Sequence, residues 1–219
     1  MAPLRLAHRG DWRVARENTI EALVAAASHP RCDGVEFDVR ASSDGVPVLA
    51  HDETLERVWG RPECVSDMTA DRLETLGLPT LEAALAALPR TAFLDVELKG
   101  DPGRAVVEVL AAGRGAELHR AAVSSFEPAT LARIGGLAPA WPRWLNARSF
   151  DDDVVETAAD LGCRGVSIEW HAIDEAGMSR ARAADLDVIA WTVRRRPTYR
   201  RLARLGVSAI CAEAAALDG

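Results

Sequence analysis

The stretch GVEFDVR, residues 34–40, alternates apolar with charged side chains. Successive side chains of a β-strand point to opposite faces, so its Val and Phe residues share one face while Glu36 and Asp38 share the other. An ionised carboxylate on a buried face is costly unless it is paired or bound to a metal. The stretch therefore predicts a strand of a packed sheet that also carries part of a functional site.

Similar β-rich runs recur along the chain, each followed by a polar turn and a helical pattern rich in Ala and Leu. The eight runs are residues 4–8, 34–40, 92–98, 121–125, 142–146, 165–168, 188–193 and 207–211. The helical patterns are residues 19–28, 81–88, 103–113, 128–134, 151–161, 174–184 and 197–205. Alternating strands and helices predict a parallel sheet, and eight repeats within 219 residues predict an α/β fold of the (β/α)8 TIM-barrel type.

The second repeat is longer than the others. Residues 46–51 form a second strand-like run after the turn dipeptide Asp44-Gly45, and residues 52–78 look like an excursion over one barrel end. The doubly wound alternative lacks its G-x-G-x-x-G marker after residues 4–8. Since no linker divides the chain, we expect one barrel domain over residues 1–219, with a short insertion after the second strand.

Helix ends carry recognisable signals. Three consecutive aspartates from Asp151 suit a helix N-terminus, where the dipole favours carboxylates, and Pro197 suits a first helical position. Gly135, Gly162 and Gly206 stand where glycines end helices. These signals support the predicted helix boundaries.

Composition excludes several classes of protein. Apolar residues make up 48% of the chain, and the net charge is only −7, which excludes a disordered chain. No apolar run approaches the ~20 residues of a membrane span, so we expect no integral membrane contact. A pI near 5.3 argues against nucleic acid as a partner. The oligomeric state is left open.

Local features suggest the cellular setting. The four cysteines are scattered without a metal or C-x-x-C spacing, so we expect them reduced and mostly buried. The first residues resemble no signal peptide, so we expect a cytoplasmic protein. The arginines at 194–196 and 200–201 are interpreted as a solvated helix face, with phosphate contact as the alternative.

A second acidic set lies in the run at residues 92–98. Asp95, Glu97 and Lys99 share one face by the same alternation. Both acidic sets stand near strand carboxyl ends, where active sites of TIM barrels lie. Converging carboxylates suit a hard divalent cation, whereas structural salt bridges with Arg or Lys are the alternative.

Two histidines also end strand-like runs: His8 before Arg9-Gly10, and His51 before Asp52. Imidazole titrates near neutral pH, so the two could act as general base and general acid beside the acidic residues. Arg9 and Lys99 add positive charge suited to a phosphoryl centre. Structural or solvent roles are expected for His29, His119 and His171.

At these residues the sequence resembles the glycerophosphodiester phosphodiesterase family. The matching motifs are AHRG (7–10), ENT (17–19), GVEFDV (34–39), DG (44–45), PV (47–48), HDETL (51–55), PTL (79–81), VELK (96–99), SSF (124–126) and AWTV (190–193). They follow in order over about residues 4–211, nearly the whole chain. The resemblance implies a TIM barrel that hydrolyses glycerophosphodiesters, such as glycerophosphocholine and glycerophosphoethanolamine, to sn-glycerol 3-phosphate and an alcohol.

The resemblance also implies roles for particular residues. Glu36, Asp38 and Glu97 match the family's ligands for one divalent cation, Ca²⁺ or Mg²⁺. His8 and His51 match its acid/base pair, and we expect His8 to be the base and His51 the acid. The nucleophile is left open between water and the 2-hydroxyl of the substrate's glycerol.

Four further residues match supporting positions of the family. Arg9 and Lys99 match cations that contact the phosphate, and Glu17 matches a polar residue that supports the site. Trp191 matches an aromatic residue at the barrel mouth, with simple core packing as its alternative. The expected partner is therefore a small phosphodiester.

The chain departs from the family pattern near its end. Arg194 follows the W-T-V motif where Asn is usual, and residues 209–213 read AICAE where the family commonly has I-I-T-D-x-P. The glycine-rich phosphate loops of many barrels are also missing. These departures concern the substrate pocket rather than the chemistry.

Three other functions remain as alternatives. The same site could act on lysophospholipids if Trp59, Trp141 and Trp144 formed part of an apolar groove. Lys99 could instead serve a Schiff-base aldolase or isomerase. Finally, the chain could be a phosphodiester-binding module without turnover.

Overall fold

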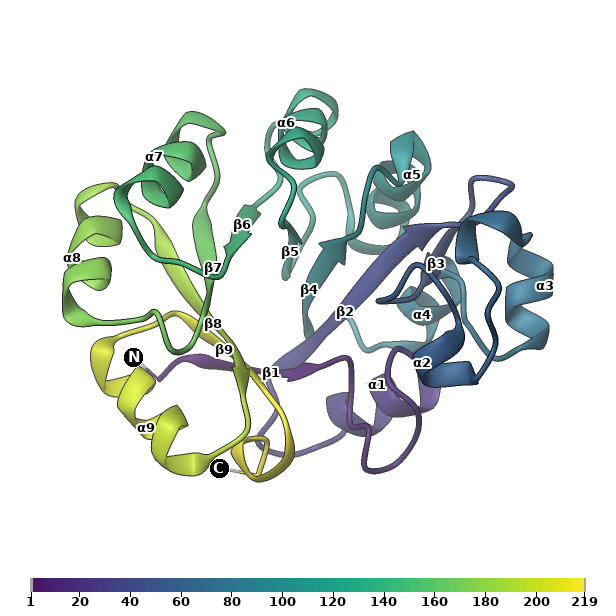
Figure 1. Ribbon diagram of the computed structural model, residues 1–219, viewed down its shortest axis with the longest axis horizontal. Coiled ribbons are helices and arrows are strands. Elements are labelled where there is room, and N and C mark those ends of the chain that lie inside the picture. The colour runs from purple at the N-terminus through teal and green to yellow at the C-terminus, as the bar shows by residue number, and fades with distance from the viewer. Residues whose placement is uncertain (1, 219) are drawn as a thin grey trace.

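A closed barrel of parallel strands forms the centre of the computed structural model, which describes residues 2–218 (Figure 1). Its strands are β1 (Leu4–His8), β2 (Gly34–Ala41), β4 (Phe93–Leu98), β5 (Ala121–Ser125), β6 (Arg143–Ala147), β7 (Gly165–Glu169), β8 (Asp187–Val193) and β9 (Ala209–Ala212). Each pairs in parallel with the next, and β9 closes on β1. The predicted TIM barrel is confirmed.

Helices surround the strands, as the alternating pattern predicts (Figure 1). They are α1 (Ile20–Ala27), α4 (Leu81–Ala87), α5 (Gly103–Arg114), α6 (Pro128–Leu137), α7 (Asp152–Asp160), α8 (Glu175–Ala183) and α9 (Arg196–Leu205). Hydroxyl or carboxylate side chains cap the first turns of several, for example Thr19 on α1 and Asp151 on α7. A 3₁₀ turn, η2 (Ala214–Ala216), follows β9.

The core has an inner and an outer layer. Inside the barrel, Leu6, Ile189 and Cys211 pack around the stacked rings of Phe93 and Trp144, whose centroids are 5.7 Å apart. Outside it, two larger apolar clusters fill the space between strands and helices. The inner layer fills the barrel interior toward the amino ends of the strands.

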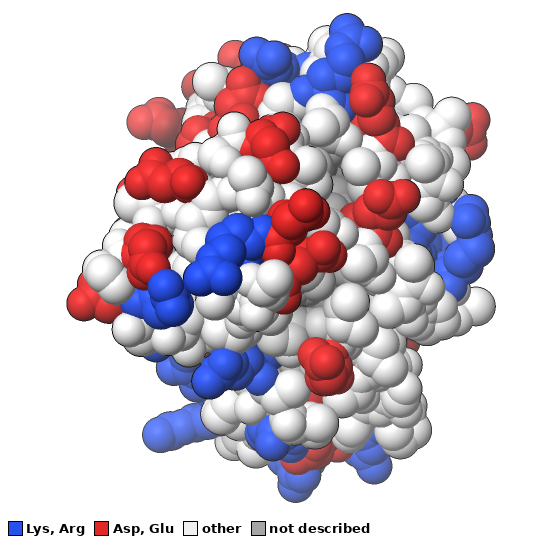
Figure 2. Space-filling model, turned by 90° about the vertical axis from the view of Figure 1, so that its right-hand side faces the viewer, with Lys and Arg blue, Asp and Glu red and all other residues white. Residues whose placement is uncertain are grey.

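The insertion after β2 forms a small unit on the flank of the barrel. It contains β3 (Pro47–Leu49), α2 (Glu56–Trp59), a 3₁₀ turn η1 (Val65–Asp67) and α3 (Ala70–Thr75), and β3 pairs antiparallel with β2. Its own apolar cluster includes Val48, Leu55 and Leu73. Acidic and basic side chains are interspersed over this side of the molecule (Figure 2).

Most element boundaries differ from the sequence prediction by a residue or more, and two of these differences are informative. Helix α6 continues through Gly135 and ends at Leu137, because a glycine without a left-handed φ does not stop a helix that is buried on one side. Strand β9 includes Ala212, which places Glu213 directly at its carboxyl end. None of the described helices combines the length and the apolar character that crossing a membrane requires.

Candidate active site

Four carboxyl groups meet where β2 and β4 run side by side. The strand register places Glu36 beside Asp95 and Asp38 beside Glu97. Because paired residues of parallel strands point to the same face, all four side chains enter the barrel interior. Oxygen atoms of Glu36, Asp38 and Glu97 lie within 4.8 Å of one another, and all three residues are buried.

Asp38 has the most complete set of partners in this cluster. Its Oδ2 accepts a hydrogen bond from Asn18 Nδ2 at 2.9 Å and lies 3.2 Å from Arg9 Nε. Its Oδ1 lies 3.0 Å from Lys99 Nζ, which also contacts Glu97. Burial opposes ionisation of Asp38, but Lys99 and Arg9 lower its pKa below the ordinary value. The predicted alternative of structural salt bridges therefore describes Asp38, and Glu97 in part.

The other carboxyl groups of the cluster are poorly compensated. Burial, followed by the charges of Asp38 and Glu97, raises the pKa of Glu36 well above its ordinary value. Burial raises the pKa of Asp95 to about 7, although its Oδ1 accepts a hydrogen bond from Ser124 at 2.6 Å. Burial and the charge of Asp38 likewise raise the pKa of Glu97 to about 7. The cluster therefore holds more negative charge than its neighbours balance.

A divalent cation fits this imbalance. Among the described residues, the arginine and lysine side chains that pair with this cluster within 4 Å are Arg9 and Lys99. Glu36 Oε1 is buried and accepts no hydrogen bond, which leaves a carboxylate oxygen ready to act as a ligand. Hard divalent cations prefer such oxygen ligands. Glu36, Asp38 and Glu97 could therefore hold one.

The loop after β1 wraps around the acidic cluster. Arg9 has a left-handed φ of 57°, and its backbone N–H donates to Glu36 Oε2 at 3.0 Å. Gly10 follows with φ 84°, and a Cβ there would lie 2.6 Å from the carbonyl carbon of Ala22, so only glycine fits. The Arg9 guanidinium then donates to Glu17 Oε1 at 2.9 Å. The H-R-G motif is thus a turn that aims Arg9 at the cluster.

Each predicted acid/base histidine has a carboxylate partner. His8 Nδ1 lies 2.5 Å from Glu213 Oε1, and His51 Nδ1 lies 2.6 Å from Asp52 Oδ1. Burial lowers the pKa of His51, and the charges of Arg9 and Lys99 lower it further. The charge of Asp38 acts in the opposite direction and raises it. Both imidazoles are therefore oriented by a carboxylate rather than left free to rotate.

A cavity of about 560 Å³ opens at this end of the barrel and connects these groups. His8 and His51 line it together with Glu36, Glu97 and Lys99. Asp38 lies behind the lining with no exposed surface, although its carboxylate belongs to the cluster. A cavity of this size can enclose a small phosphodiester.

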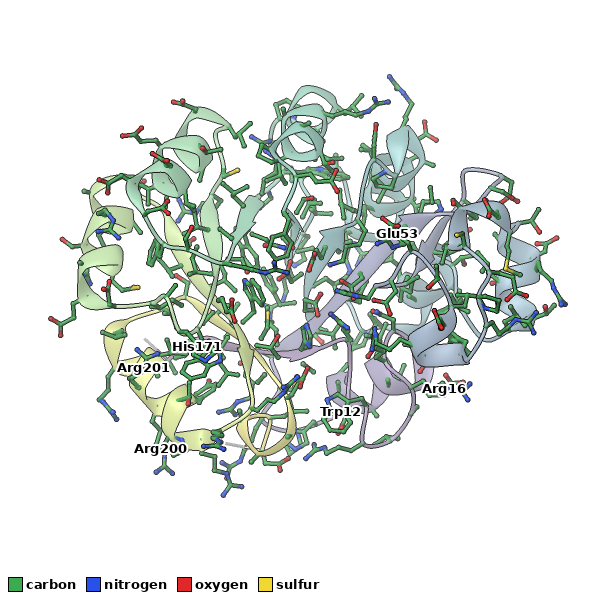
Figure 3. The ribbon with its side chains drawn as sticks, in the orientation of Figure 1. Trp12, Arg16, Glu53, His171, Arg200 and Arg201 are labelled. Carbon is green, nitrogen blue, oxygen red and sulfur yellow. The ribbon has the colours of Figure 1, made fainter. Side chains whose placement is uncertain are left out.

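Aromatic side chains form the rim of the cavity. Trp191 Nε1 donates to the Ser167 carbonyl at 2.9 Å, and its ring meets the edge of Phe126 with centroids 5.4 Å apart. Trp12, which Figure 3 shows on the loop after β1, is 47% exposed. Trp191 thus lies at the mouth of the cavity and also packs against the inner core, so it occupies both of the places that the sequence left open for it.

Proteins similar to this chain are known. A profile of the glycerophosphoryl diester phosphodiesterase family matches residues 8–216. The chain belongs to this family. It is accordingly a phosphoric diester hydrolase, as the sequence predicts.

Individual family members resemble the chain to different extents. Bacillus subtilis YhdW, provisionally named a glycerophosphodiester phosphodiesterase, is 27% identical over 94% of this chain and 92% of its own length. Mouse glycerophosphodiester phosphodiesterase 1 is 33% identical over 47% of this chain and only 36% of its own length. An Oleispira antarctica phosphodiesterase, solved in complex with the product sn-glycerol-3-phosphate, is 27% identical with a TM-score of 0.84 over 96% of this chain and 93% of that one.

This member of the glycerophosphoryl diester phosphodiesterase family brings together every residue that the sequence predicts for its site. Asn18 and Asp52 belong to the ENT and HDETL motifs, but the sequence does not predict their hydrogen bonds to Asp38 and His51. Glu213 lies in the segment that departs from the family pattern, and the sequence does not predict its contact with His8. Asn18 follows Glu17 and Asp52 follows His51, so their places beside predicted site residues could have indicated a role in the site. No feature of the sequence near Glu213 indicates its contact with His8.

The three tryptophans considered for the lysophospholipid alternative do not form an apolar groove at the site. Trp141 and Trp144 are only 3% and 5% exposed because they pack in the core. Trp59 belongs to the cluster of the insertion and lies under the guanidinium of Arg16. None of the three lines the large cavity, so the exposed aromatic residues at its rim are different ones.

The arginines at residues 194–196 and 200–201 do not all have the same surroundings. Arg201 donates to the carbonyls of Ile173 and Trp170 at 2.9 Å each, and Figure 3 shows it with Arg200 and His171 beside α9. In contrast, Arg194 lines the cavity. The predicted solvated helix face therefore describes Arg195, Arg196 and Arg200, which are exposed, whereas Arg194 belongs to the site.

Proposed function

We propose that the chain hydrolyses glycerophosphodiesters to sn-glycerol 3-phosphate and an alcohol, using one divalent cation and two histidines. The observation that carries this proposal is the convergence of His8, His51 and the carboxylates of Glu36 and Glu97 on a single cavity. Family membership and the product bound to the Oleispira relative support the same reaction. A cytoplasmic location remains a prediction from the sequence.

We assign the cation, Ca²⁺ or Mg²⁺, to Glu36, Asp38 and Glu97. When bound, it would supply Lewis-acid stabilisation of the charge that develops on the phosphoryl group. Asn18 and Arg9 hold the Asp38 carboxylate in place for this role. The same Arg9 and Lys99 then offer positive charge to the substrate's phosphate, and Glu17 orients Arg9.

His8 acts as the general base in this proposal. Its Nδ1 faces Glu213, so its Nε2 is directed toward the acidic cluster, 3.8 Å from Glu36 Oε2. A proton taken at Nε2 from water, or from the substrate's 2-hydroxyl, makes an imidazolium that the Glu213 carboxylate stabilises.

His51 acts as the general acid and protonates the departing alkoxide. Burial, together with the charges of Arg9 and Lys99, lowers the pKa of His51 against the opposing charge of Asp38. A phosphodiester anion beside it adds negative charge, which favours the protonated ring, and Asp52 holds that ring from behind. The bound substrate therefore favours the protonated form of His51 that a general acid requires.

The Schiff-base alternative is disfavoured by the surroundings of Lys99. Burial would lower the pKa of its ammonium, but Asp38 and Glu97 raise it above the ordinary value. A Schiff-base lysine must be neutral to attack a carbonyl. Lys99 is therefore suited to bind phosphate, not to act as a nucleophile.

The lysophospholipid alternative now depends on other aromatic residues. Trp12 and Phe126, at the cavity rim, are 47% and 39% exposed and could contact an acyl chain. Turnover of lysophosphatidylcholine compared with that of glycerophosphocholine separates the two substrates directly. We expect glycerophosphocholine to be preferred.

The test is release of glycerol 3-phosphate from glycerophosphocholine and glycerophosphoethanolamine with Mg²⁺ or Ca²⁺ present. We expect His8→Ala and His51→Ala each to lower kcat by ~10²-fold or more, the usual contribution of an acid/base group. His171→Ala is the matched control, because His171 is exposed and outside the cavity.

Two results would contradict the proposal. A near-normal rate in either site variant would remove that histidine from the mechanism. No release by the unmodified protein with either cation, despite measurable substrate binding, would favour the non-catalytic binding module.

A further inference from the structure

The imidazole of His51 is the first member of a short chain of hydrogen-bonded polar groups. His51 Nδ1 faces Asp52 Oδ1 at 2.6 Å, and Asp52 Oδ2 accepts a hydrogen bond from Arg57 Nε at 2.6 Å. The three residues are close in sequence, within the insertion. The carboxylate thus has one oxygen on the imidazole and the other on a guanidinium.

His8 has the same arrangement, built from distant parts of the chain. His8 Nδ1 lies 2.5 Å from Glu213 Oε1, and Glu213 Oε2 accepts a hydrogen bond from Arg194 Nε at 2.7 Å. Arg194 and the segment at residues 209–213, which ends with Glu213, are where the sequence departs from the family pattern. In the folded chain these two departures form one ion pair, and that pair contacts the proposed base.

Strand pairing explains how the three residues meet. The register places Ala7 of β1 beside Ala212 of β9, so the residues that follow, His8 and Glu213, are neighbours at the mouth. The Glu213 N–H donates to the carbonyl of Val193, the last residue of β8, at 2.9 Å, which brings Arg194, the residue after the strand, to the same point. The backbone therefore holds this group in position independently of the side chains.

We propose that Glu213 is a positioning residue for His8, and that Arg194 holds the Glu213 carboxylate in place, so that His8 presents Nε2 to the reacting phosphate. This inference rests on the proposed function. An ionised carboxylate only accepts hydrogen bonds, so the proton of the neutral imidazole lies on Nδ1 and the lone pair on Nε2.

The surroundings agree with that orientation. The side chain of Glu213 is only 8% exposed, so water competes little for its oxygens. Burial would raise the pKa of Glu213, but the hydrogen bond from His8 and the charge of Arg194 lower it to about 2. His8 Nε2 faces Thr192 Oγ1 at 3.4 Å and Glu36 Oε2 at 3.8 Å, on the side of the cavity.

The first test is kinetic, on the protein with its divalent cation, and compares Glu213→Gln with the unmodified chain. We expect kcat to fall roughly 10- to 100-fold with little change in KM, because substrate binding is kept while the tautomer is no longer fixed. Arg194→Gln should lower kcat less, by no more than about fivefold, since the guanidinium is largely exposed. Glu169→Gln, at the end of β7 and paired with His171, is the control that should leave both constants unchanged.

The second test reads the imidazole itself. In ¹⁵N spectra of the unmodified protein we expect His8 with a protonated Nδ1 and an unprotonated Nε2, and in Glu213→Gln a mixture of the two tautomers. Protonated Nε2 in the unmodified protein would overturn the inference even if the variant failed to fold. A rise in KM with constant kcat in Arg194→Gln would assign that residue to substrate contact instead.

The outcomes also separate this inference from the proposed function. Full kcat in Glu213→Gln with loss of activity in His8→Ala would overturn the positioning role and leave the reaction intact. Full activity in both variants would contradict the proposed function itself.

Discussion

At the scale of single residues, neighbouring carboxyl groups of one cluster differ in their tendency to ionise. Asp38 has a lowered pKa because Lys99 and Arg9 outweigh its burial, whereas burial dominates for Glu36 and raises its pKa. Both residues lie on β2, two positions apart, so the difference arises from their partners and not from the strand. Such divergence within one site is typical of functional groups.

Asp95 provides a test of this residue-level argument. Its pKa of about 7 exceeds the ordinary 3.8, so between these values the folded protein holds a proton that the unfolded chain has released. Stability therefore falls as pH rises from about 4 to 7. Asp95→Asn cannot ionise, so we expect it to be more stable than the unmodified protein at pH 8, with the difference vanishing near pH 4.

The measurement is urea denaturation of both proteins in EDTA at pH 4.5 and pH 8. We expect a gain in the free energy of unfolding of roughly 2 kcal/mol or more at pH 8, as an order of magnitude. Asp160→Asn, an exposed change at the end of α7, is the control. An equal effect of Asp95→Asn at the two pH values would show that Asp95 is ionised in the folded protein.

At the scale of elements, the register between β2 and β4 creates the acidic cluster. Gly34 begins β2 opposite Phe93, and a Cβ at Gly34 would lie 2.0 Å from the Phe93 carbonyl oxygen. The glycine thus allows the two strands to approach at the bottom of the barrel. Glu36 and Asp38 follow two and four residues later, so their position depends on this close approach.

Gly34→Ala should therefore reduce both stability and activity. Since the neighbouring group is backbone, the strands must shift, and we expect a loss of roughly 3 kcal/mol in the free energy of unfolding. Gly136→Ala is the matched control: a Cβ there meets nothing within 4 Å, and alanine favours the helix. Thermal denaturation of the two variants checks the prediction, and a Gly34→Ala protein as stable as the control protein would refute it.

At the scale of the whole molecule, barrel closure gathers groups from both ends of the chain. His8 on β1 and Glu213 after β9 meet because β1 and β9 are paired. The insertion adds His51 and Arg57 from the side, and Arg57 also donates to Glu17 Oε2 at 2.9 Å. A ligand that binds this assembled cluster should therefore stabilise the entire barrel.

Binding of a divalent cation should raise the melting temperature. At a concentration ~100 times its Kd, a ligand adds about 2.7 kcal/mol, which corresponds to roughly 5–10 °C for a domain of this size. We expect Mg²⁺ or Ca²⁺ to raise the melting temperature by this amount after EDTA treatment. Glu97→Gln should lose most of the rise, whereas Glu108→Gln, an exposed change on α5, should keep it. An identical rise in all three proteins would exclude Glu97 as a ligand.

The sequence by itself determined the barrel and the membership of the acidic cluster. Strand alternation places Glu36 with Asp38, and Asp95 with Glu97, on single faces, and that period is a local property of the backbone. The residues that start and end helices are equally local signals, as Asp151 at the start of α7 shows. Such a signal gives the wrong helix end at Gly135, where α6 continues to Leu137.

Only the tertiary structure decided which partner each charged group has. Lys99 contacts Asp38 and Glu97, and Glu213 contacts His8, because barrel closure sets distances between side chains that are far apart in the sequence. The exposure of each tryptophan depends on the same packing, which buries Trp144 and leaves Trp12 at the mouth. Contacts of this kind depend on long-range strand pairing, whereas the periodicity of a strand depends only on the residues beside it.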